Sequence, residues 1–176
     1  MQPADQPPKS PVSVRAAQLA DLPRLTEIYN FYVVNTPVTF DIEPYTVDAR
    51  ATWLNQFATA GRYRLLVAEQ DGSLLGYAGT TRFRAKAAYD PTVETTIYCA
   101  PEAIGRAVGS LLYSALFEAI AGKDIHRIVA GYTLPNPASS ALHERFGFDR
   151  VGIFCENGRK FGRYWDVAWN ERPLHL

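Results

Sequence analysis

The sequence predicts an α/β (α+β) layer fold with one mixed sheet and helices on both faces. Strand-like and helix-like segments follow one another in the order β-α-α-β-β-β-α-β-α-β-β, which is typical of a layered α and β domain. The dipeptide Asp71-Gly72 between two apolar runs is a strong β-hairpin signal. No internal repeat or composition break divides the 176 residues, so we expect one domain over residues 12–172.

The first half of the chain opens with a strand over residues 12–16. Asp21 can cap a helix that ends near Asn35. The apolar stripe of this helix consists of Leu22, Leu25, Ile28, Tyr29 and Tyr32. After the loop TPVTFDIEP, Thr46 caps a second helix. Its apolar side is formed by Ala51, Leu54, Phe57 and Ala58.

Three strands follow in the middle of the chain. Residues 64–70 and 74–83 form the predicted hairpin, and the basic loop RFRAKAAYDP leads into a strand that ends at Cys99. A helix is predicted over residues 107–121. Its wide apolar face consists of Val108, Leu111, Leu112, Ala115, Leu116, Ala119 and Ile120.

The last third alternates again. We expect a strand over residues 127–133 and a short helix over 136–146 that Gly147 closes. A final strand pair, 148–156 and 163–169, is expected around the turn ENGRK. Residues 173–176 are expected to form a short tail.

Composition and charge exclude several classes of protein. Eighteen basic residues balance eighteen acidic ones, so no overall field favours nucleic acid or an anionic membrane. No apolar run approaches the roughly 20 residues of a membrane span. Residues 1–11 are polar and Pro-rich, which predicts a disordered leader. Cys99 and Cys155 lie in apolar, strand-like surroundings and are expected to be buried free thiols of a cytoplasmic protein.

The most informative stretch is ETTIYCAPEAIGRAVGS, residues 94–110. It joins a strand, a glycine-spaced turn and the start of an amphipathic helix. Backbone N–H groups and the positive end of a helix dipole at such a turn suit a phosphate. Glycines that only make a turn and let a helix pack closely are the alternative. A Rossmann fingerprint fits poorly because the loop is central in the chain, and no Lys-Ser/Thr follows to make a Walker loop.

This strand-loop-helix unit, followed by a strand and by NPASSALHERFGF, resembles the GCN5-related N-acetyltransferase (GNAT) family, whose sheet is mixed and mostly antiparallel. With the segments IYNFYV, NTPVTF, RAKAAYDPTVETTIY and KFGRYWD, the resemblance narrows to phosphinothricin and methionine sulfoximine N-acetyltransferases. It covers about residues 12–172. The resemblance implies acetyl transfer from acetyl-CoA to the α-amine of a small amino acid.

The resemblance also assigns the cofactor contacts. The family loop, Gln/Arg-x-x-Gly-x-Gly/Ala, binds the pyrophosphate of acetyl-CoA. The positions implied for acetyl-CoA are Ile97, Tyr98, Cys99, Gly105, Arg106, Ala107, Val108, Gly109, Ser110 and Asn136. Ile104 and Ala107 depart from the family pattern, which predicts weaker cofactor binding, with Arg106 as a substitute charge. Asn136 before Pro137 is also a good helix cap, and one residue can do both.

For catalysis the resemblance implies Glu94 as general base, which would deprotonate the substrate ammonium directly or through a water. An outward-facing strand carboxylate is the alternative. Alternation places Glu94, Thr96 and Tyr98 on one face of the strand. Backbone N–H groups near Ile97 can polarise the thioester carbonyl. His143 matches a histidine proposed to assist catalysis in the family, and a packed structural histidine is its alternative.

Substrate contacts are expected from residues in and around the basic loop. Arg84 and Lys86 could hold an amino-acid carboxylate or phosphinate, although a solvated basic loop is the usual fate of such charges. Phe40 and Tyr89 match aromatic positions of the family's substrate pocket. Arg163 is a further candidate for an anionic group or a dimer contact.

Together the residues and the resemblance imply a direct-transfer N-acetyltransferase that uses acetyl-CoA, no metal and a small amino acid. The resemblance alone implies a homodimer. Scattered histidines and the lack of clustered carboxylates argue against a catalytic metal. Two alternatives remain open: acetylation of another amine, such as a peptide N-terminus or polyamine, and a non-catalytic acyl-CoA-binding protein.

Overall fold

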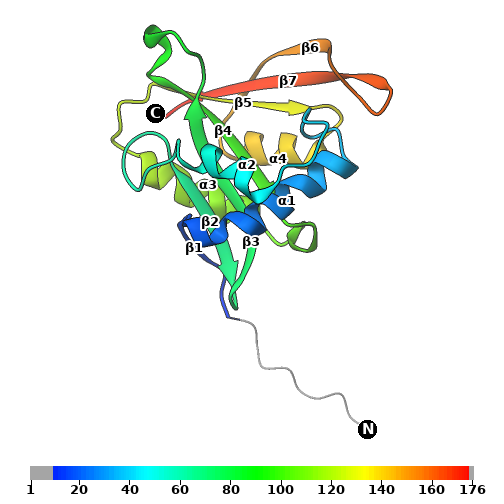
Figure 1. The fold of residues 1–176 in the computed structure, drawn as a ribbon. Coiled ribbons are helices and arrows are strands. Elements are labelled where there is room, and N and C mark those ends of the chain that lie inside the picture. The colour runs from blue at the N-terminus through cyan, green and yellow to red at the C-terminus, as the bar shows by residue number, and fades with distance from the viewer. Residues whose placement is uncertain (1–9, 175–176) are drawn as a thin grey trace.

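A computed structural model describes residues 10–174 of the chain (Figure 1). Its centre is a seven-stranded sheet in the order β1-β2-β3-β4-β5-β7-β6. The strands are β1 (Ser13–Ala16), β2 (Leu65–Gln70), β3 (Ser73–Arg82), β4 (Thr92–Cys99), β5 (Arg127–Thr133), β6 (Asp149–Lys160) and β7 (Arg163–Pro173). Every neighbouring pair is antiparallel except β4 and β5, so the predicted mixed, mostly antiparallel sheet is confirmed.

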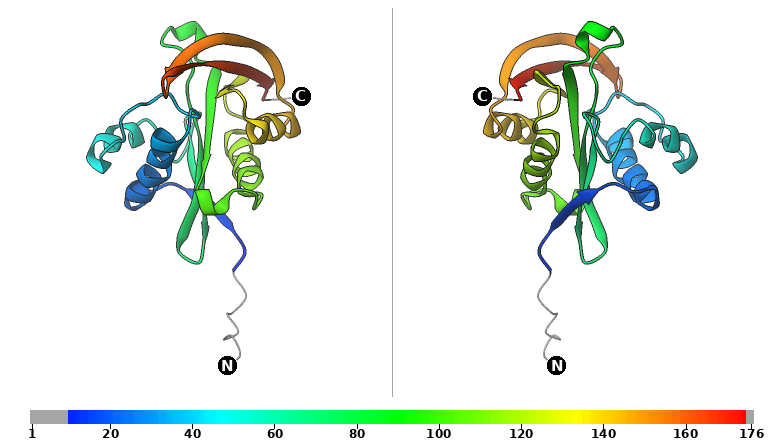
Figure 2. Two further views of the ribbon diagram at one scale, coloured as in Figure 1. Left: turned by 90° about the vertical axis from the view of Figure 1, so that its right-hand side faces the viewer. Right: turned by 90° about the vertical axis from the view of Figure 1, so that its left-hand side faces the viewer.

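Helices cover both faces of this sheet, as expected. The helices are α1 (Leu22–Asn35), α2 (Val47–Leu54), α3 (Val108–Ile120) and α4 (Pro137–Arg145). Seen edge-on, α1 and α2 lie on one side of the sheet and α3 and α4 on the other (Figure 2). Single 3₁₀ turns occur at Leu19–Asp21, Ala87–Tyr89 and Pro101–Ala103.

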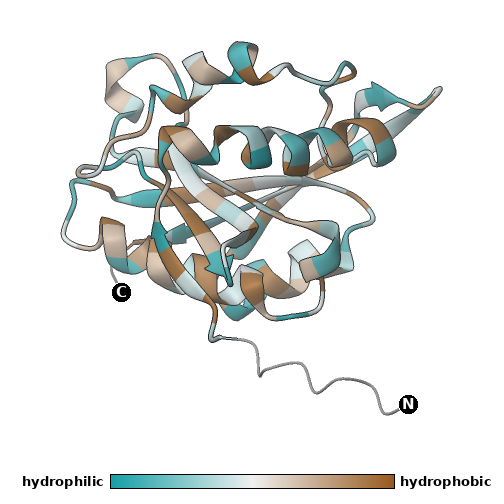
Figure 3. Cartoon of the chain, turned by 60° about the horizontal axis from the view of Figure 1, so that its bottom comes forward, coloured by the Kyte–Doolittle hydropathy of each residue, from teal (hydrophilic) through white to brown (hydrophobic). Residues whose placement is uncertain are grey.

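The core forms where the apolar stripes of the helices meet the sheet. In α3 the buried residues recur at helical spacing: Val108, Leu112, Leu116 and Ile120. Hydrophobic and hydrophilic residues accordingly alternate along the helices (Figure 3). One residue of the predicted apolar face, Leu111, is exposed rather than part of the core. Among the described residues, no helix is long and apolar enough to span a membrane.

The predicted hairpin around Asp71-Gly72 is confirmed. Both residues have positive φ, 50° and 76°, which is the backbone of a tight two-residue turn between β2 and β3. Thr46 caps α2 by accepting a hydrogen bond from the backbone N–H of Ala49 at 3.2 Å. This helix ends earlier than predicted, at Leu54, so Phe57 and Ala58 follow it as a loop.

Three expectations near the C-terminus were wrong. The turn between β6 and β7 is Phe161-Gly162, not ENGRK, because β6 continues through Lys160 with an irregularity in register after Phe154. The tail does not begin at residue 173, since Pro173 pairs with Arg127 and Leu174 is buried in the core. Cys155 is exposed on β6 rather than buried.

The expected leader, residues 1–11, lies almost wholly outside the described residues. Its last part is in place: the backbone N–H of Ser10 donates to Asp71 at 3.3 Å. The end of the expected tail, residues 175–176, is also outside the described range.

Candidate active site

The parallel strands β4 and β5 separate halfway along their length, and this separation positions the site. They pair only from Thr92 to Glu94 and from Arg127 to Val129. Beyond these residues β4 continues to Cys99 along β3, and β5 continues to Thr133 along β7. The facing edges of the two strands therefore carry backbone groups that no sheet partner uses among the described residues, and a ligand can bind between them.

A cavity of about 470 Å³ lies at the end of this separation, and we call it the wedge cavity. It is bounded by the end of β4, the N-terminus of α3 and one face of α4. Nine of the ten residues predicted to contact the cofactor line it: Ile97, Tyr98, Cys99, Gly105, Ala107, Val108, Gly109, Ser110 and Asn136. The structure thus brings together residues that lie up to 39 positions apart in the sequence.

The loop before α3 has the backbone of an anion cradle. Gly105 and Ala107 have positive φ of 80° and 58°, and Ala107 takes the N-cap position of α3 in the left-handed region. No side chain of the described residues caps this helix. The N–H groups of Val108 and Gly109 have no hydrogen-bond partner among the described residues, so they can bind a ligand at the positive end of the dipole of this 13-residue helix.

Gly109 lies in the first turn of α3, where the helix approaches β4 and α4 closely. A Cβ at this position would lie 3.4 Å from Leu142 and 3.5 Å from Ile97. A methyl group therefore fits at this position in ordinary van der Waals contact, and a larger side chain would extend into the wedge cavity. The close approach places the N-terminus of α3 directly against the cavity.

Arg106 is the exception among the predicted cofactor residues. Its guanidinium donates to the side-chain oxygen of Gln70 instead, and it does not line the wedge cavity. The cation that does line the cavity is Arg145 of α4, together with Ala138 and Leu142. None of these three was predicted from the sequence. Their spacing of four and three residues puts them on one helix face, and this pattern could have identified them.

Asn136 has both features expected of it. Its side-chain oxygen accepts a hydrogen bond from the backbone N–H of Ser139 at 3.0 Å, which caps α4. The residue also lines the wedge cavity.

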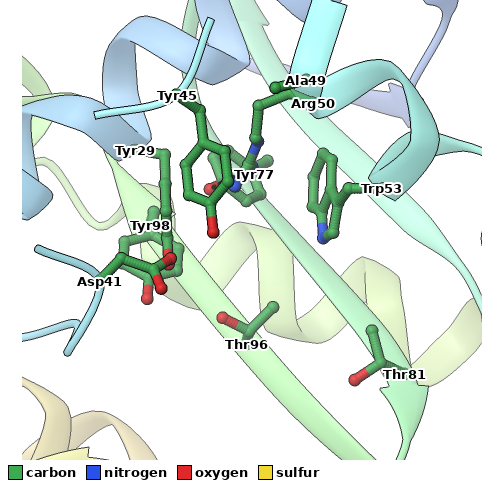
Figure 4. A pocket seen from close by; sticks show the side chains of 10 residues that line it. All are labelled: Tyr29, Asp41, Tyr45, Ala49, Arg50, Trp53, Tyr77, Thr81, Thr96 and Tyr98. Carbon is green, nitrogen blue, oxygen red and sulfur yellow. Dashed lines mark hydrogen bonds between the residues drawn. The ribbon is translucent and has the colours of Figure 1, made fainter. Parts of the chain in front are cut away.

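A second cavity of about 260 Å³ lies on the opposite face of the sheet, beneath α1 and α2 (Figure 4). We call it the tyrosine cavity. It is lined by Tyr29, Asp41, Tyr45, Ala49, Arg50, Trp53, Tyr77, Thr81, Thr96 and Tyr98. Tyr98 lines both cavities, so the two meet at this residue of β4.

Glu94 lines neither cavity itself, but on β4 it lies next to residues that line the tyrosine cavity. It shares the strand face of Thr96 and Tyr98, and its partner on β3 is Thr81, which also lines the cavity. Glu94 is half-buried, and this burial raises the pKa of its carboxyl, while the nearby cation of Arg84 lowers it. A carboxyl whose pKa is raised in this way is a stronger base than an exposed carboxylate.

His143 lies in the core, outside both cavities. It is 3% exposed, its Nδ1 is 2.7 Å from the Ser139 carbonyl oxygen, and its Nε2 is 3.1 Å from the Tyr113 hydroxyl. Its ring stacks on Tyr132 with centroids 5.2 Å apart. Burial lowers the pKa of the imidazole. These surroundings favour the packed alternative, and its catalytic role stays a prediction.

The structure brings only some of the predicted substrate residues close to one another. Arg84, Lys86 and Tyr89 are exposed on the loop before β4, and Arg84 is close enough to Glu94 to affect its pKa. Phe40 lines neither cavity but packs its ring against Gly158 of β6. Arg163, at the tip of the β6–β7 hairpin, stacks on Trp165.

Cys99 does not lie in an activating environment. Cys99 is a half-buried free thiol of the wedge cavity, and burial raises its pKa to about 11. Its backbone carbonyl accepts a hydrogen bond from the Tyr32 hydroxyl at 2.7 Å. Within residues 10–174, no group of three or more His, Cys, Asp or Glu side chains is arranged to hold a metal ion.

Known proteins share this architecture. The family model for the acetyltransferase (GNAT) domain matches residues 14–169. A phosphinothricin N-acetyltransferase from Streptomyces coelicolor is 54% identical over 170 residues, covering 96% of this chain and 99% of the relative. An L-methionine sulfoximine/L-methionine sulfone acetyltransferase from Pseudomonas aeruginosa is 34% identical, covering 92% and 94%.

Solved structures agree with the sequence relatives. A GNAT superfamily phosphinothricin acetyltransferase from Sinorhizobium meliloti, in complex with AcCoA, superimposes with a TM-score of 0.87 at 34% identity, covering 92% of this chain and 88% of that one. The protein yncA from Salmonella typhimurium, with acetyl-CoA, gives 0.86 at 31% identity, covering 93% and 94%. The chain therefore belongs to the GNAT family, as an N-acetyltransferase similar to phosphinothricin and methionine sulfoximine N-acetyltransferases.

Proposed function

We propose that this protein transfers an acetyl group from acetyl-CoA to the α-amine of a small amino acid of the phosphinothricin or methionine sulfoximine type, with Glu94 as general base. The observation that carries the proposal is the position of β4 between two cavities that meet at Tyr98. The wedge cavity suits a nucleotide-bearing thioester, and the tyrosine cavity suits its acceptor.

The residues of the wedge cavity fit acetyl-CoA. The uncapped N-terminus of α3 and the positive-φ residues Gly105 and Ala107 suit its pyrophosphate. Arg145 adds a positive charge. The unpaired edge of β4 offers backbone groups to an extended amide-containing arm. When bound, acetyl-CoA supplies an acetyl group activated as a thioester.

On the face of the sheet that carries the tyrosine cavity, Glu94 acts as the general base for the substrate amine. The substrate arrives as an ammonium, whose nitrogen has no free electron pair, and Glu94 accepts one proton from it directly or through a water. The neutral amine would then attack the acetyl carbon, the C–S bond of the thioester would break, and CoA would leave as a thiol after taking up the second proton that the nitrogen loses. Burial of Glu94 favours this role because it raises the pKa of the carboxyl towards neutral pH.

The test is release of free thiol from acetyl-CoA in the presence of different amines. We expect strong signals with phosphinothricin, methionine sulfoximine and methionine sulfone, and weak ones with spermidine and a short peptide. A signal confined to the last two would favour acetylation of another amine. Acetyl-CoA binding by calorimetry without turnover of any amine would favour the non-catalytic alternative.

Homodimer formation and a cytoplasmic location are also part of the proposal. Exposed apolar side chains on the β6–β7 hairpin, among them Val151 and Phe154, support a contact with a second copy of the chain.

A further inference from the structure

In the part of the chain that the structure describes, the tyrosine cavity contains a buried cation that forms no ion pair. Arg50 of α2 is 5% exposed. Its guanidinium makes one long hydrogen bond among the described residues, from Nη2 to the Tyr77 hydroxyl at 3.4 Å. Its Nε is buried without a partner there. Within residues 10–174, no carboxylate lies within ion-pair distance of this guanidinium.

Aromatic rings surround the guanidinium in place of an acid (Figure 4). Its central carbon lies 4.2 Å from the ring centre of Tyr29 and 3.9 Å from that of Trp53. The π faces of these rings attract the cation but accept few of its N–H groups. A buried guanidinium usually has oxygen acceptors in its plane, so this cluster lacks a partner that a ligand can supply.

The position of Arg50 relative to Glu94 indicates which part of a ligand would reach it. Tyr77, which accepts the hydrogen bond from Arg50, pairs with Tyr98 of β4. Glu94 is four residues from Tyr98, a distance of about 13 Å along a strand. In an amino acid, the α-amine and α-carboxylate are bonded to the same carbon, so the end of an extended side chain spans a separation of this size better than the carboxylate does. The far end of a side chain is the part that can approach Arg50 while the amine faces Glu94.

We propose that Arg50 and the rings of Tyr29 and Trp53 bind the oxygen-bearing end of the substrate side chain, such as a sulfone, a sulfoximine or a singly charged phosphinate. This inference rests on the proposed function. Asp41 lines the same cavity, and its carboxylate accepts a hydrogen bond from Tyr29. That negative charge disfavours a doubly charged group, so Arg50 selects polarised oxygens rather than high charge.

The test compares two ligands that differ only in the terminal oxygens, L-methionine sulfone and L-methionine. Their dissociation constants are measured by calorimetry in the presence of CoA, for the wild type, Arg50→Met and Arg64→Met. We expect the wild type to bind the sulfone more tightly than methionine. In Arg50→Met the ratio of the two dissociation constants should shrink by about 10- to 100-fold, the usual effect of losing a hydrogen bond to a charged group. Arg64→Met is the matched control. It also removes a guanidinium with a buried, unpaired Nε, but one outside the tyrosine cavity, so the preference should remain.

Equal loss of affinity for both ligands in Arg50→Met would overturn the inference and make Arg50 a packing residue. A third ligand, the α-carboxamide of L-methionine sulfone, lacks the carboxylate. If Arg50→Met changes the ratio of the dissociation constants of L-methionine sulfone and this carboxamide, Arg50 binds the carboxylate and the inference is overturned. If Arg50→Met does not fold, Arg50→Lys keeps the charge without the planar fork, and we expect an intermediate preference. Binding with the expected preference but no acetyl transfer would contradict the proposed function alone.

Discussion

Two opposing influences act on the residue at the centre of the proposed chemistry. Burial on β4 raises the pKa of Glu94, and the cation of Arg84 lowers it. Burial is the larger of the two, so the carboxyl stays protonated to a higher pH than an exposed glutamate. A protonated Glu94 cannot accept the substrate proton, and the proposed reaction must slow as the pH falls.

Replacement of Glu94 by Gln should slow turnover by about 100- to 10,000-fold, because the amide cannot act as a base. The acid limb of the pH–rate profile should disappear with it, while the dissociation constant for acetyl-CoA stays close to that of the wild type. Arg84→Met should move the wild-type limb to higher pH, since it removes the cation that lowers the pKa. An unchanged turnover rate in Glu94→Gln across the neutral pH range would remove Glu94 from the role of base.

The raised pKa also affects stability. The folded protein holds the Glu94 proton more tightly than the unfolded chain, so ionisation of Glu94 reduces the free energy of unfolding as the pH rises through the folded-state pKa. Glu94→Gln should therefore unfold at a higher urea concentration than the wild type at neutral pH. Glu118→Gln, which changes an exposed carboxylate on α3, is the matched control and should show little difference.

His143 should behave as a packing residue. His143→Gln should lower the free energy of unfolding by about 1–3 kcal/mol, since buried hydrogen-bonding groups lose their partners. Burial lowers the pKa of His143, so the unfolded chain binds its proton more readily, and wild-type stability should fall as the pH drops below the ordinary value of 6.5. Urea unfolding in mildly alkaline and mildly acidic buffer measures both effects. Severely impaired turnover in a stably folded His143→Gln would instead support a catalytic role.

At the level of secondary-structure elements, the loop and first turn of α3 decide how a phosphate can approach. Ala107 adopts a left-handed conformation that glycine takes more easily, with φ of 58°. The departure from glycine at this position therefore strains the backbone slightly, and the fold accepts that strain. Ile104, the other departure, is 60% exposed and lines the wedge cavity without a polar side-chain group to offer.

Gly109→Trp should raise the acetyl-CoA dissociation constant by about 100-fold or more, a loss of roughly 2.7 kcal/mol, because an indole at this position would fill the wedge cavity against Leu142 and Ile97. Gly109→Ala is the matched control. Its methyl group would make contacts of 3.4 Å or longer, so affinity should stay within a few-fold of the wild type. Calorimetry with acetyl-CoA measures both. Normal affinity in Gly109→Trp would show that acetyl-CoA binds elsewhere.

Across the whole molecule, the β6–β7 hairpin closes over the loop between α1 and α2. Lys160 on β6 is buried, and its ammonium donates to the Thr39 carbonyl at 2.8 Å. The ring of the neighbouring Phe40 lies against Gly158, where a Cβ would overlap it. Segments from opposite ends of the chain thus hold the loop that borders the tyrosine cavity.

Gly158→Ala should lower the free energy of unfolding by about 1–3 kcal/mol, the usual cost of overpacking, because the Phe40 ring must move. Gly152→Ala, on the same strand, is the matched control, since nothing lies within 4 Å of a Cβ at that position. Urea unfolding measures the difference. Equal stability of the two variants would mean that the loop adjusts freely under the hairpin.

A dimer formed through the β6–β7 hairpin should dissociate in Val151→Asp, because this side chain is 63% exposed and a buried carboxylate in an interface is costly. Leu19→Asp alters a side chain that is 71% exposed elsewhere and should leave the oligomeric state unchanged. Light scattering after size exclusion measures the mass. A monomeric wild type, or a Val151→Asp protein that stays dimeric, would contradict this arrangement.

The order of amino acids alone was enough to predict the element order, the Asp71-Gly72 turn, the caps at Thr46 and Asn136 and the glycine-spaced loop before α3. These features depend on residues close together in the chain, so local periodicity and turn chemistry predict them. The same local reasoning failed at ENGRK, since β6 passes through a turn-like sequence while pairing with β7.

Packing between distant segments, by contrast, determines where β4 and β5 separate, which cavities lie on either side of β4 and which cation each cavity contains. Arg145 rather than Arg106 lines the wedge cavity, and Arg50 lies without an acidic partner among the described residues in the tyrosine cavity. The packing of Phe40 against Gly158 was likewise invisible in the sequence, which left the burial of His143 as one of two alternatives. The physical reason is that burial and electrostatic environment depend on contacts between distant segments, which periodicity along one segment does not report.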